Sequence, residues 1–268
     1  MLAIGERING MFQDVKKAIQ KKDKKVIQDL AVKQTQAGAA FLDVNVGTAA
    51  QDQEGTMKWL IETIQEVCKT PIAIDSQKLN VIKAGIEVVA KGSNFLINSC
   101  PLNTKKDPEV LEKYLALCQE HNASLVALTM DREGVPQNVE KRVEIAAAIV
   151  EKAMTAGVST DKLFIDPIIL PINVSQNQPT FLLEVMSQVK LLADPRPHMT
   201  VGLSNLSQGA SERSLINRTF LVMAIAVGLD SAIVDVFDTE LMDAAITAEM
   251  LLNKQIYSDS FLKAARMR

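Results

Sequence analysis

Two aspartates follow short apolar runs in the same way. The run KLFIDPIILP carries Asp166 directly before Pro167, and the earlier run PIAIDS carries Asp75 near its end. A carboxylate at the end of a buried strand accepts hydrogen bonds, either from a ligand or from the turn that follows. The repeated arrangement suggests that other strand ends could carry groups that act on the same ligand.

The ends of the other apolar runs are also polar. The candidate residues are Glu6, Arg7, Asp43, Asn45, Asp75, Asn98, Asp166, Asn205, Asp235 and Asp238. Any one of them could simply cap a helix or close an Asx turn. The whole set is harder to explain in that way, because a concentration of polar groups near a core needs hydrogen-bonding partners. We therefore interpret the set as the lining of a binding site.

The residue types in this set indicate what the site could bind. Carboxylates accept from adjacent N–H donors, and amide side chains both donate and accept. A fused heterocycle with an amino-pyrimidinone edge, such as a pterin, presents this pattern. A sugar phosphate fits poorly, because no glycine-rich loop follows the seventh or eighth run to hold a phosphate.

Composition narrows the class of protein further. The chain has 268 residues, of which 47% are hydrophobic, and a net charge of -3, so it can bury a large core and has no basic field for nucleic acid. Its three cysteines, Cys68, Cys100 and Cys118, are widely spaced, and its two histidines, His121 and His198, lie far apart. This pattern favours a reducing compartment and no metal site. With no signal-like segment or membrane-length apolar run, we expect a cytoplasmic protein without a membrane partner.

The order of the elements predicts the fold. Eight short apolar runs, each followed by a helical segment, lie at residues 2–9, 39–47, 71–76, 94–100, 124–130, 162–168, 200–205 and 231–237. Strands that are apolar on both faces are typical of a parallel sheet covered by helices. Because none of them reads as an edge strand, we predict an α/β (β/α)8 TIM barrel, a single domain over 1–268, in preference to an open doubly wound sheet.

Two helical segments have recognisable ends. The segment 14–38 is predicted to be helical and to end at Gly38. The segment 211–230 is predicted to begin with a serine cap and to end near Gly228, with Met223 in the helix core.

Several motifs resemble those of one family. They are GERIN at 5–9, LDVNVG at 42–47, IDS at 74–76, INS at 97–99, IDPIILP at 165–171 and GLSNLSQG at 202–209. Together they resemble the pterin-binding methyltransferases, a group that includes the methyltetrahydrofolate:corrinoid/iron–sulfur protein methyltransferases and the folate-side methyltransferases of O-demethylase systems. The resemblance implies a (β/α)8 barrel that forms a homodimer.

The resemblance also implies roles for individual residues. Those that match the pterin-holding positions are Asp75, Asn98 and Asp166, while Asn205 matches the asparagine whose amide approaches N5. Further positions near the ligand are Gly202, Gln208 and Arg213. The residues expected mainly to orient the others are Glu6, Asp43 and Asn45.

The activity that the resemblance implies is methyl transfer between N5 of tetrahydrofolate and the cobalt of a corrinoid, with 5-methyltetrahydrofolate as the methylated form. The amide of Asn205 would assist by hydrogen bonding to N5. The chain has no D-x-H-x-x-G corrinoid motif, so we expect a separate corrinoid protein as partner. Such a reaction serves either the acetyl-CoA pathway or O-demethylation, and the sequence favours neither.

Three alternatives remain open at this point. A dihydropteroate synthase-like enzyme would share the barrel and the pterin pocket, but its expected K-x-S-R and late R-x-H segments are not found in the expected position. A magnesium-dependent enolase- or aldolase-like barrel could use the acidic residues, although it would leave the asparagines unexplained. A folate-binding protein without catalytic activity would show the same pterin contacts.

Overall fold

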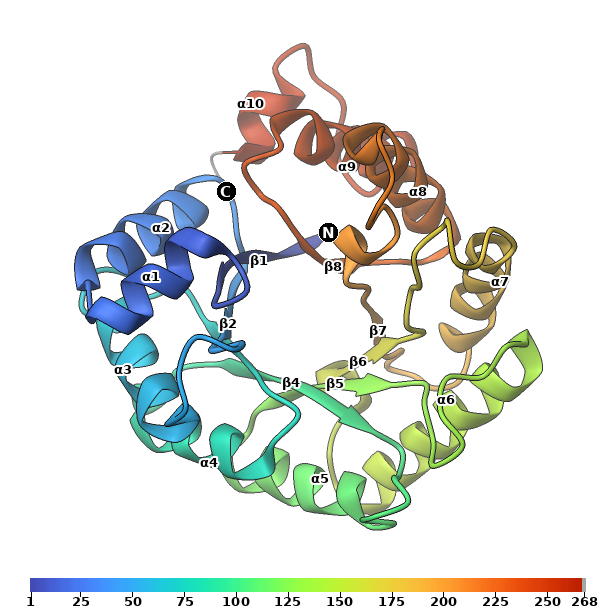
Figure 1. The fold of residues 1–268 in the computed structure, drawn as a ribbon. Coiled ribbons are helices and arrows are strands. Elements are labelled where there is room, and N and C mark those ends of the chain that lie inside the picture. The colour runs from blue at the N-terminus through green and yellow to red at the C-terminus, as the bar shows by residue number, and fades with distance from the viewer. Residues whose placement is uncertain (267–268) are drawn as a thin grey trace.

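The computed structural model describes residues 1–266 and forms a barrel of parallel strands surrounded by helices (Figure 1). The strands are β1 (Leu2–Asn9), β2 (Phe41–Asn45), β3 (Ile72–Asp75), β4 (Phe95–Pro101), β5 (Ser124–Leu128), β6 (Leu163–Asp166), β7 (His198–Met199) and β8 (Ser231–Val234). The helices are α1 (Gln13–Lys21), α2 (Lys24–Gln36), α3 (Gln53–Gln65), α4 (Leu79–Val88), α5 (Val110–His121), α6 (Val139–Thr155), α7 (Gln178–Val189), α8 (Arg213–Val227), α9 (Thr239–Leu251) and α10 (Phe261–Arg266). None of these helices combines the length and apolar character that crossing a bilayer requires.

The barrel closes between β7 and β8, the two ends of the hydrogen-bonded series of strands. The strands follow the order β7-β6-β5-β4-β3-β2-β1-β8, with β1 parallel to both β2 and β8. The remaining gap is bridged when the backbone N–H of Ile233 donates to the carbonyl of Val201 at 2.9 Å, next to a parallel bridge between Gly202 and Ile233. The predicted single-domain (β/α)8 TIM barrel is therefore confirmed.

The alternation of side chains along the strands places the polar groups. Ile4, Ala73, Leu96, Val126 and Phe164 form a small buried cluster separate from the larger core between strands and helices. Side chains two residues apart on a strand point to the same face. The polar strand ends Asp75, Asn98 and Asp166 are each two residues beyond a member of this cluster, so they form a layer above it at the carboxyl end of the barrel.

The predicted helix over 14–38 is two helices. The chain breaks at Lys22, which has a positive φ of 54°, and Asp23 then caps α2 by accepting from the backbone N–H of Lys25 at 3.1 Å. The lysines hid this break, because they continue from α1 through Lys22 into the first residues of α2. The predicted end at Gly38 is confirmed, since Gly38 has a φ of 94°, which suits a residue without a Cβ.

The seventh strand is shorter and earlier than predicted. Residues 200–205 were expected as a strand, but β7 is His198–Met199, and Leu203–Asn205 forms a 3-10 turn. This turn is closed by the backbone N–H of Asn205, which donates to the carbonyl of Gly202 at 3.1 Å. Asn205 therefore stands on a turn above the barrel instead of on a strand.

Helix α8 ends as predicted but differs in two other respects. It ends before Gly228, which has a φ of 129°, yet it begins without a side-chain cap, so the predicted serine cap is wrong. Met223 is 46% exposed, and the prediction that it lies in the core is also wrong. The inner face of α8 is already filled by Phe220, Leu221, Ala224 and Ile225, although the surrounding sequence is apolar on every side.

Candidate active site

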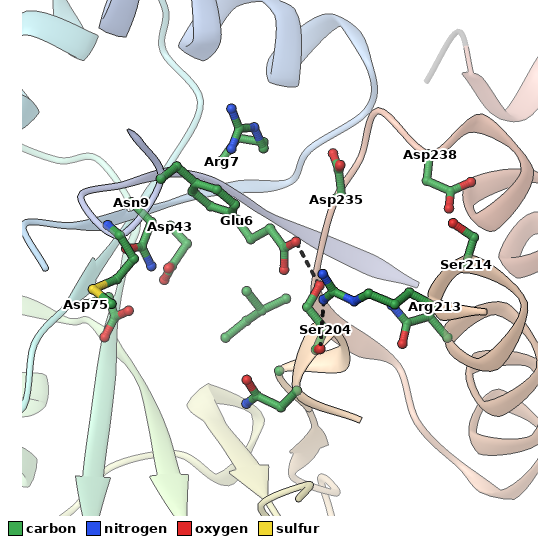
Figure 2. Close-up of a pocket in the computed structure, with 16 residues that line it drawn as sticks. Glu6, Arg7, Asn9, Asp43, Asp75, Ser204, Arg213, Ser214, Asp235 and Asp238 are labelled. Atoms are coloured by element: carbon green, nitrogen blue, oxygen red, sulfur yellow. Dashed lines mark hydrogen bonds between the residues drawn. The ribbon is translucent and has the colours of Figure 1, made fainter. Parts of the chain in front are cut away.

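A cavity of about 660 Å³ opens at the carboxyl ends of the strands (Figure 2). Its lining includes Glu6, Arg7, Asp43, Asp75, Gly202, Asn205, Arg213, Asp235 and Asp238. In Figure 2, Asp43 and Asp75 lie on one side, Arg213 and Ser214 lie on the other, and Glu6 projects between them. The cavity is therefore bounded by two polar walls that come from different parts of the chain.

The wall formed by β2, β3 and β4 holds a pair of carboxyl groups. The side chains of Asp43 and Asp75 hydrogen-bond to each other. Asn45 donates from Nδ2 to Asp75 Oδ2 at 2.6 Å, and Asn98 donates from Nδ2 to Asp43 Oδ1 at 2.9 Å. We call Asp43, Asn45, Asp75 and Asn98 the acid wall. Each amide fixes one carboxyl oxygen, so the orientation of the pair is set before any ligand binds.

Burial controls the protonation of the acid wall. Desolvation raises the pKa of Asp43 well above its ordinary value, and the nearby charge of Asp75 raises it further. Desolvation also raises the pKa of Asp75, while the hydrogen bonds from Asn45 and Asp43 oppose that rise. Asp43 therefore keeps a proton and donates it towards Asp75, which ionises first. The pair offers a carboxylate as acceptor with a proton held beside it.

Asp166 stands at the end of β6 and is 9% exposed. Burial raises the pKa of its carboxyl to about 7, against the opposing effects of the Ile168 N–H and the positive charge of Arg142. Its Oδ1 accepts from the backbone N–H of Ile168 at 2.7 Å. Asp166 can therefore act as a hydrogen-bond acceptor in its ionised form and as a donor in its protonated form near neutral pH.

The opposite wall comes from the turn after β7 and the start of α8. Ser204 donates from its hydroxyl to Glu6 Oε1 at 2.8 Å, and Arg213 donates from Nη2 to the Ser204 carbonyl at 3.2 Å (Figure 2). Arg213 also donates from Nε to the hydroxyl of Ser207 at 3.2 Å. We call Ser204, Asn205 and Arg213 the turn wall. Burial raises the pKa of Glu6, while the hydrogen bond from Ser204 and the charge of Arg213 oppose the rise.

Gly202 leaves space for the amide of Asn205, and both residues line the cavity. A Cβ added at Gly202 would lie 3.0 Å from Asn205 Nδ2, which is tighter than an ordinary van der Waals contact. Asn205 itself is exposed at the cavity mouth. Glycine therefore suits this position of the GLSN motif, because a larger residue would crowd the side chain of Asn205.

The structure brings most of the expected residues together. Asp75, Gly202, Asn205 and Arg213 line the cavity, and Asn98 joins them through Asp43. Asn98 and Asp166 are themselves absent from the cavity lining, and so is Gln208, which is exposed. Because the turn that carries Asn205 reverses the chain, a residue three positions further on need not face the same space.

The three residues expected mainly to orient others are divided by the structure. Asn45 has that position, since it donates to Asp75. Glu6 and Asp43 line the cavity themselves.

Asp235 and Asp238 line the cavity and also accept backbone hydrogen bonds. The donors are the N–H groups of Phe237 and Leu241, at 3.0 Å each, as a capping role requires.

Several lining residues were not found from the sequence. They are Asn9, Met11, Phe12, Ser204, Ser214, Asn217 and Ile233. Asn9 is the last residue of β1, so the rule that strand ends face the mouth could have found it. Nothing local to the sequence marks Ser214 or Asn217, which reach the cavity because α8 begins beside it. Among residues 1–266, no group of three or more His, Cys, Asp or Glu is placed to hold a metal ion.

Comparison with known proteins identifies the family. The family described as pterin binding enzyme matches residues 6–235. The chain belongs to this family. A methylcorrinoid:tetrahydrofolate methyltransferase from Eubacterium limosum is 33% identical over 270 residues, which cover 99% of this chain and 96% of that protein. The resemblance of the motifs is therefore confirmed at the level of the family.

Part of a larger enzyme is similar to this pterin-binding barrel. Methionine synthases from Mycobacterium leprae and Mycobacterium tuberculosis are 34% and 33% identical over 242 residues, which cover 87% of this chain but 20% of each synthase. Solved dihydropteroate synthases share the fold at lower identity. The Thermus thermophilus enzyme has a TM-score of 0.64 at 18% identity, covering 96% of this chain and 94% of its own.

Proposed function

We propose that this pterin-binding barrel is a methyltransferase that moves a methyl group between N5 of tetrahydrofolate and the cobalt of a corrinoid. The observation that carries the proposal is the similarity to the Eubacterium limosum methyltransferase over nearly the whole of both chains. The similarity of part of the methionine synthases supports the same chemistry. The polar cavity at the barrel mouth provides residues suited to the folate side of the reaction.

Asp75, Asn98 and Asp166 are proposed to hold the pterin ring. The amino-pyrimidinone edge presents adjacent N–H donors, which suit the carboxylates of Asp75 and Asp166. Burial raises the pKa values of both carboxyls above their ordinary range, against the hydrogen bonds that they already accept. A ligand that brings N–H donors would stabilise the ionised forms, so the donor set fits a pterin.

Asn205 is proposed to hydrogen-bond to N5, the nitrogen that gives up or receives the methyl group. A tertiary amine is a poor leaving group unless a hydrogen bond stabilises the charge that develops on it. The amide of Asn205 lies in the cavity lining opposite the acid wall, where it can donate to the N5 side of a ring held at Asp75. The corrinoid supplies a cobalt that accepts or donates the methyl group, while the barrel contributes positioning and this hydrogen bond.

The corrinoid is proposed to arrive on a separate protein. The chain contains no D-x-H-x-x-G motif, and its two histidines are His121 and His198. His198 begins β7, at the opposite end of the barrel from the cavity, and its Nδ1 lies 3.0 Å from Asp230 Oδ2. The exposed turn wall leaves Asn205 accessible to a partner that docks over the mouth.

A dihydropteroate synthase activity receives less support from the structure. Arg196 and His198 form an R-x-H triplet, but both bind Asp230 beside the start of β7 and not at the cavity. The similarity to solved dihydropteroate synthases is 14–18% in identity and extends to the fold. Methyl transfer instead assigns roles to Asp75 and Asn205, which do line the cavity.

A homodimer is proposed from the outer face of α8. Leu215, Val222 and Met223 are 59%, 37% and 46% exposed, and their spacing of seven and eight residues places them on one side of the helix. An apolar stripe of this kind is typical of a surface that a second subunit covers. Light scattering on the parent and on a Leu215→Glu, Met223→Glu variant tests this, with a dimer expected to become a monomer. A monomeric parent would contradict it.

A cytoplasmic location is also proposed. Cys68, Cys100 and Cys118 are all free thiols, and Cys100 and Cys118 are buried. Free, widely spaced cysteines are usual where the compartment is reducing.

The activity can be tested with free reagents. The purified full chain is mixed with 5-methyltetrahydrofolate and reduced cobalamin, and the cobalt absorption spectrum is followed for methylcobalamin. We expect product formation that depends on the protein and falls in an Asn205→Ala variant. Tetrahydrofolate titration with and without magnesium separates a metal enzyme from this proposal. Folate binding without any methyl transfer would reduce the protein to a pterin-binding module.

A further inference from the structure

Arg142 is a fully buried cation whose guanidinium binds backbone carbonyls. It lies on α6 and is 1% exposed. Its Nε donates to the carbonyl of Pro136 at 2.9 Å, and its Nη1 donates to the carbonyls of Ile168 at 3.0 Å and of Pro167. A buried charge is costly unless it is well compensated. The position of Arg142 therefore calls for an explanation beyond packing.

The carbonyls that Arg142 binds belong to the turn directly after Asp166. In this turn Ile168 has a φ of 61°, which is unfavourable for a β-branched residue. Gln178 of α7 adds a bond from Nε2 to the Ile168 carbonyl at 3.3 Å. Hydrogen bonds from two helices thus hold the turn in a conformation that it would not adopt alone.

This conformation directs the Ile168 N–H at the Asp166 carboxylate. The N–H donates to Asp166 Oδ1 at 2.7 Å, so the orientation of the carboxylate depends on the orientation of the Ile168 peptide. Because Arg142 fixes the carbonyls on either side of that turn, it acts on Asp166 without being part of the cavity lining.

We propose that Arg142 is a positioning residue for pterin binding, which holds the Pro167–Ile168 turn so that the Asp166 carboxyl group is fixed in the orientation that receives the ring. The inference rests on the proposed function, in which Asp166 accepts from the pterin. It assigns to a buried arginine outside the cavity lining a part in ligand affinity.

Charge acts in the same direction as geometry. Burial raises the pKa of Asp166, and the positive charge of Arg142 from α6 opposes the rise, as does the hydrogen bond from the Ile168 N–H. In return, the carboxylate of Asp166 opposes the effect of burial, which lowers the pKa of Arg142. Loss of the arginine removes both influences, so Asp166 would stay protonated to higher pH.

Two substitutions separate charge from geometry. Arg142→Met keeps an apolar stem and removes the charge and the three bonds, whereas Arg142→Lys keeps a charge but cannot reach three carbonyls as a planar guanidinium does. Arg196→Met is the control, because Arg196 pairs with Asp230 away from the cavity. Thermal unfolding of each variant establishes that it is folded before its binding is compared.

Two readouts are measured on the full chain. Carbon NMR titration of the Asp166 carboxyl is performed without ligand, and tetrahydrofolate affinity is measured by calorimetry at several pH values. For Arg142→Met we expect the Asp166 midpoint to move upward and the affinity at neutral pH to fall about tenfold. For Arg142→Lys we expect a midpoint near that of the parent with weaker binding. In an Asp166→Asn background, Arg142→Met should have little further effect on affinity.

The outcomes distinguish this inference from the proposed function. An unchanged Asp166 midpoint in folded Arg142→Met overturns the inference whether or not folate binds. If that variant does not fold, parent-like affinity in Arg142→Lys overturns it. An equal loss of affinity with and without Asp166→Asn also contradicts it, because Arg142 would then act by another route. A shifted midpoint in a protein whose parent does not bind tetrahydrofolate supports the role of Arg142 and rejects the proposed function.

Discussion

On the acid wall Asp43 and Asn98 are buried, Asn45 and Asp75 are partly buried, and the four side chains are bonded to one another. On the turn wall Asn205 and Arg213 are exposed. The acid wall is built on β2, β3 and β4, where the site residues are neighbours in register: Asn45 lies beside Asp75, and Asp75 lies beside Asn98. The turn wall depends on a 3-10 turn and the first residues of α8. One wall is fixed by the sheet, and the other stands at the edge of the protein.

This difference suggests that the acid wall serves binding of the ring and that the turn wall serves the methyl-transfer step. A ring that must be recognised by its hydrogen-bonding edge benefits from acceptors that are oriented before binding. A group that meets a bond being made or broken must instead reach the space where a second macromolecule approaches. Substitutions in the acid wall should therefore change affinity, and substitutions in the turn wall should change rate.

The largest expected effect is that of Asp75→Ala on folate affinity. The change leaves the pterin N–H donors without an acceptor in the complex, at about 1–3 kcal/mol for each unpaired group. With two donors unpaired, the affinity should fall by at least about 30-fold. Calorimetry with tetrahydrofolate measures it, and Asp29→Ala serves as the control, because Asp29 pairs with Lys25 on the outside of α2. Parent-like affinity in folded Asp75→Ala would place the ring elsewhere.

The next effect is the pH dependence of the ligand-free protein. Burial raises the pKa of Asp166 from 3.8 to about 7, so the protonated carboxyl is favoured in the folded state. Its contribution to stability is complete below the unfolded pKa and is lost as pH rises towards about 7. At about 1.4 kcal/mol for each pH unit, the upper bound is about 4 kcal/mol.

Urea unfolding of the parent and of Asp166→Asn at a series of pH values measures this contribution. The parent should lose stability as pH rises from about 4 to about 7. In Asp166→Asn the decline should be shallower, with the remainder due to Asp43, Asp75 and Glu6, whose pKa values burial also raises. Equal slopes in the two proteins would show that Asp166 ionises in the folded protein as readily as in the unfolded one.

The third effect belongs to the turn wall. Asn205→Ala should lower the single-turnover rate of methyl transfer more than it raises the folate dissociation constant. Loss of a charge-assisted hydrogen bond should raise the activation free energy by about 1.5–3 kcal/mol. Stopped-flow spectroscopy and a separate binding titration on the same variant measure the two quantities. Equal changes in both would make Asn205 a ground-state ligand and remove the distinction between the walls.

The smallest effect is expected from Gly202→Ala. Gly202 has a φ of -79°, which alanine adopts without strain, so the backbone should be unchanged. The added Cβ would meet the Asn205 amide, which is exposed and can turn aside. We expect the activation free energy of methyl transfer to rise by less than about 1 kcal/mol, with unchanged folate affinity. The same substitution in an Asn205→Ala background should have no effect on rate, and a persistent effect would indicate a different role for Gly202.

The sequence could predict much of the site because strand ends are a local feature. Alternation along a strand is fixed by backbone geometry, so an apolar run that ends in a polar residue reports both the strand and the face of that residue. Asp75, Asn98 and Asp166 were found in this way as candidates, and the motifs then suggested their roles. Gly38 and Gly228 marked helix ends for a similarly local reason, since each has a positive φ that favours glycine.

The features that the sequence missed depend on which distant segments meet. Asn98 and Asp43 are 55 residues apart when they hydrogen-bond, and Arg142 reaches the Ile168 carbonyl across 26 residues. Proton sharing, burial of a charge and exposure of one helix face arise from neighbours that no local pattern specifies. The sequence by itself determined the barrel and a polar ring at its mouth. Only the packing of the strands and helices decided that Asp43 and Asp75 form a pair, that Gln208 lies outside the cavity, and that Met223 faces outward.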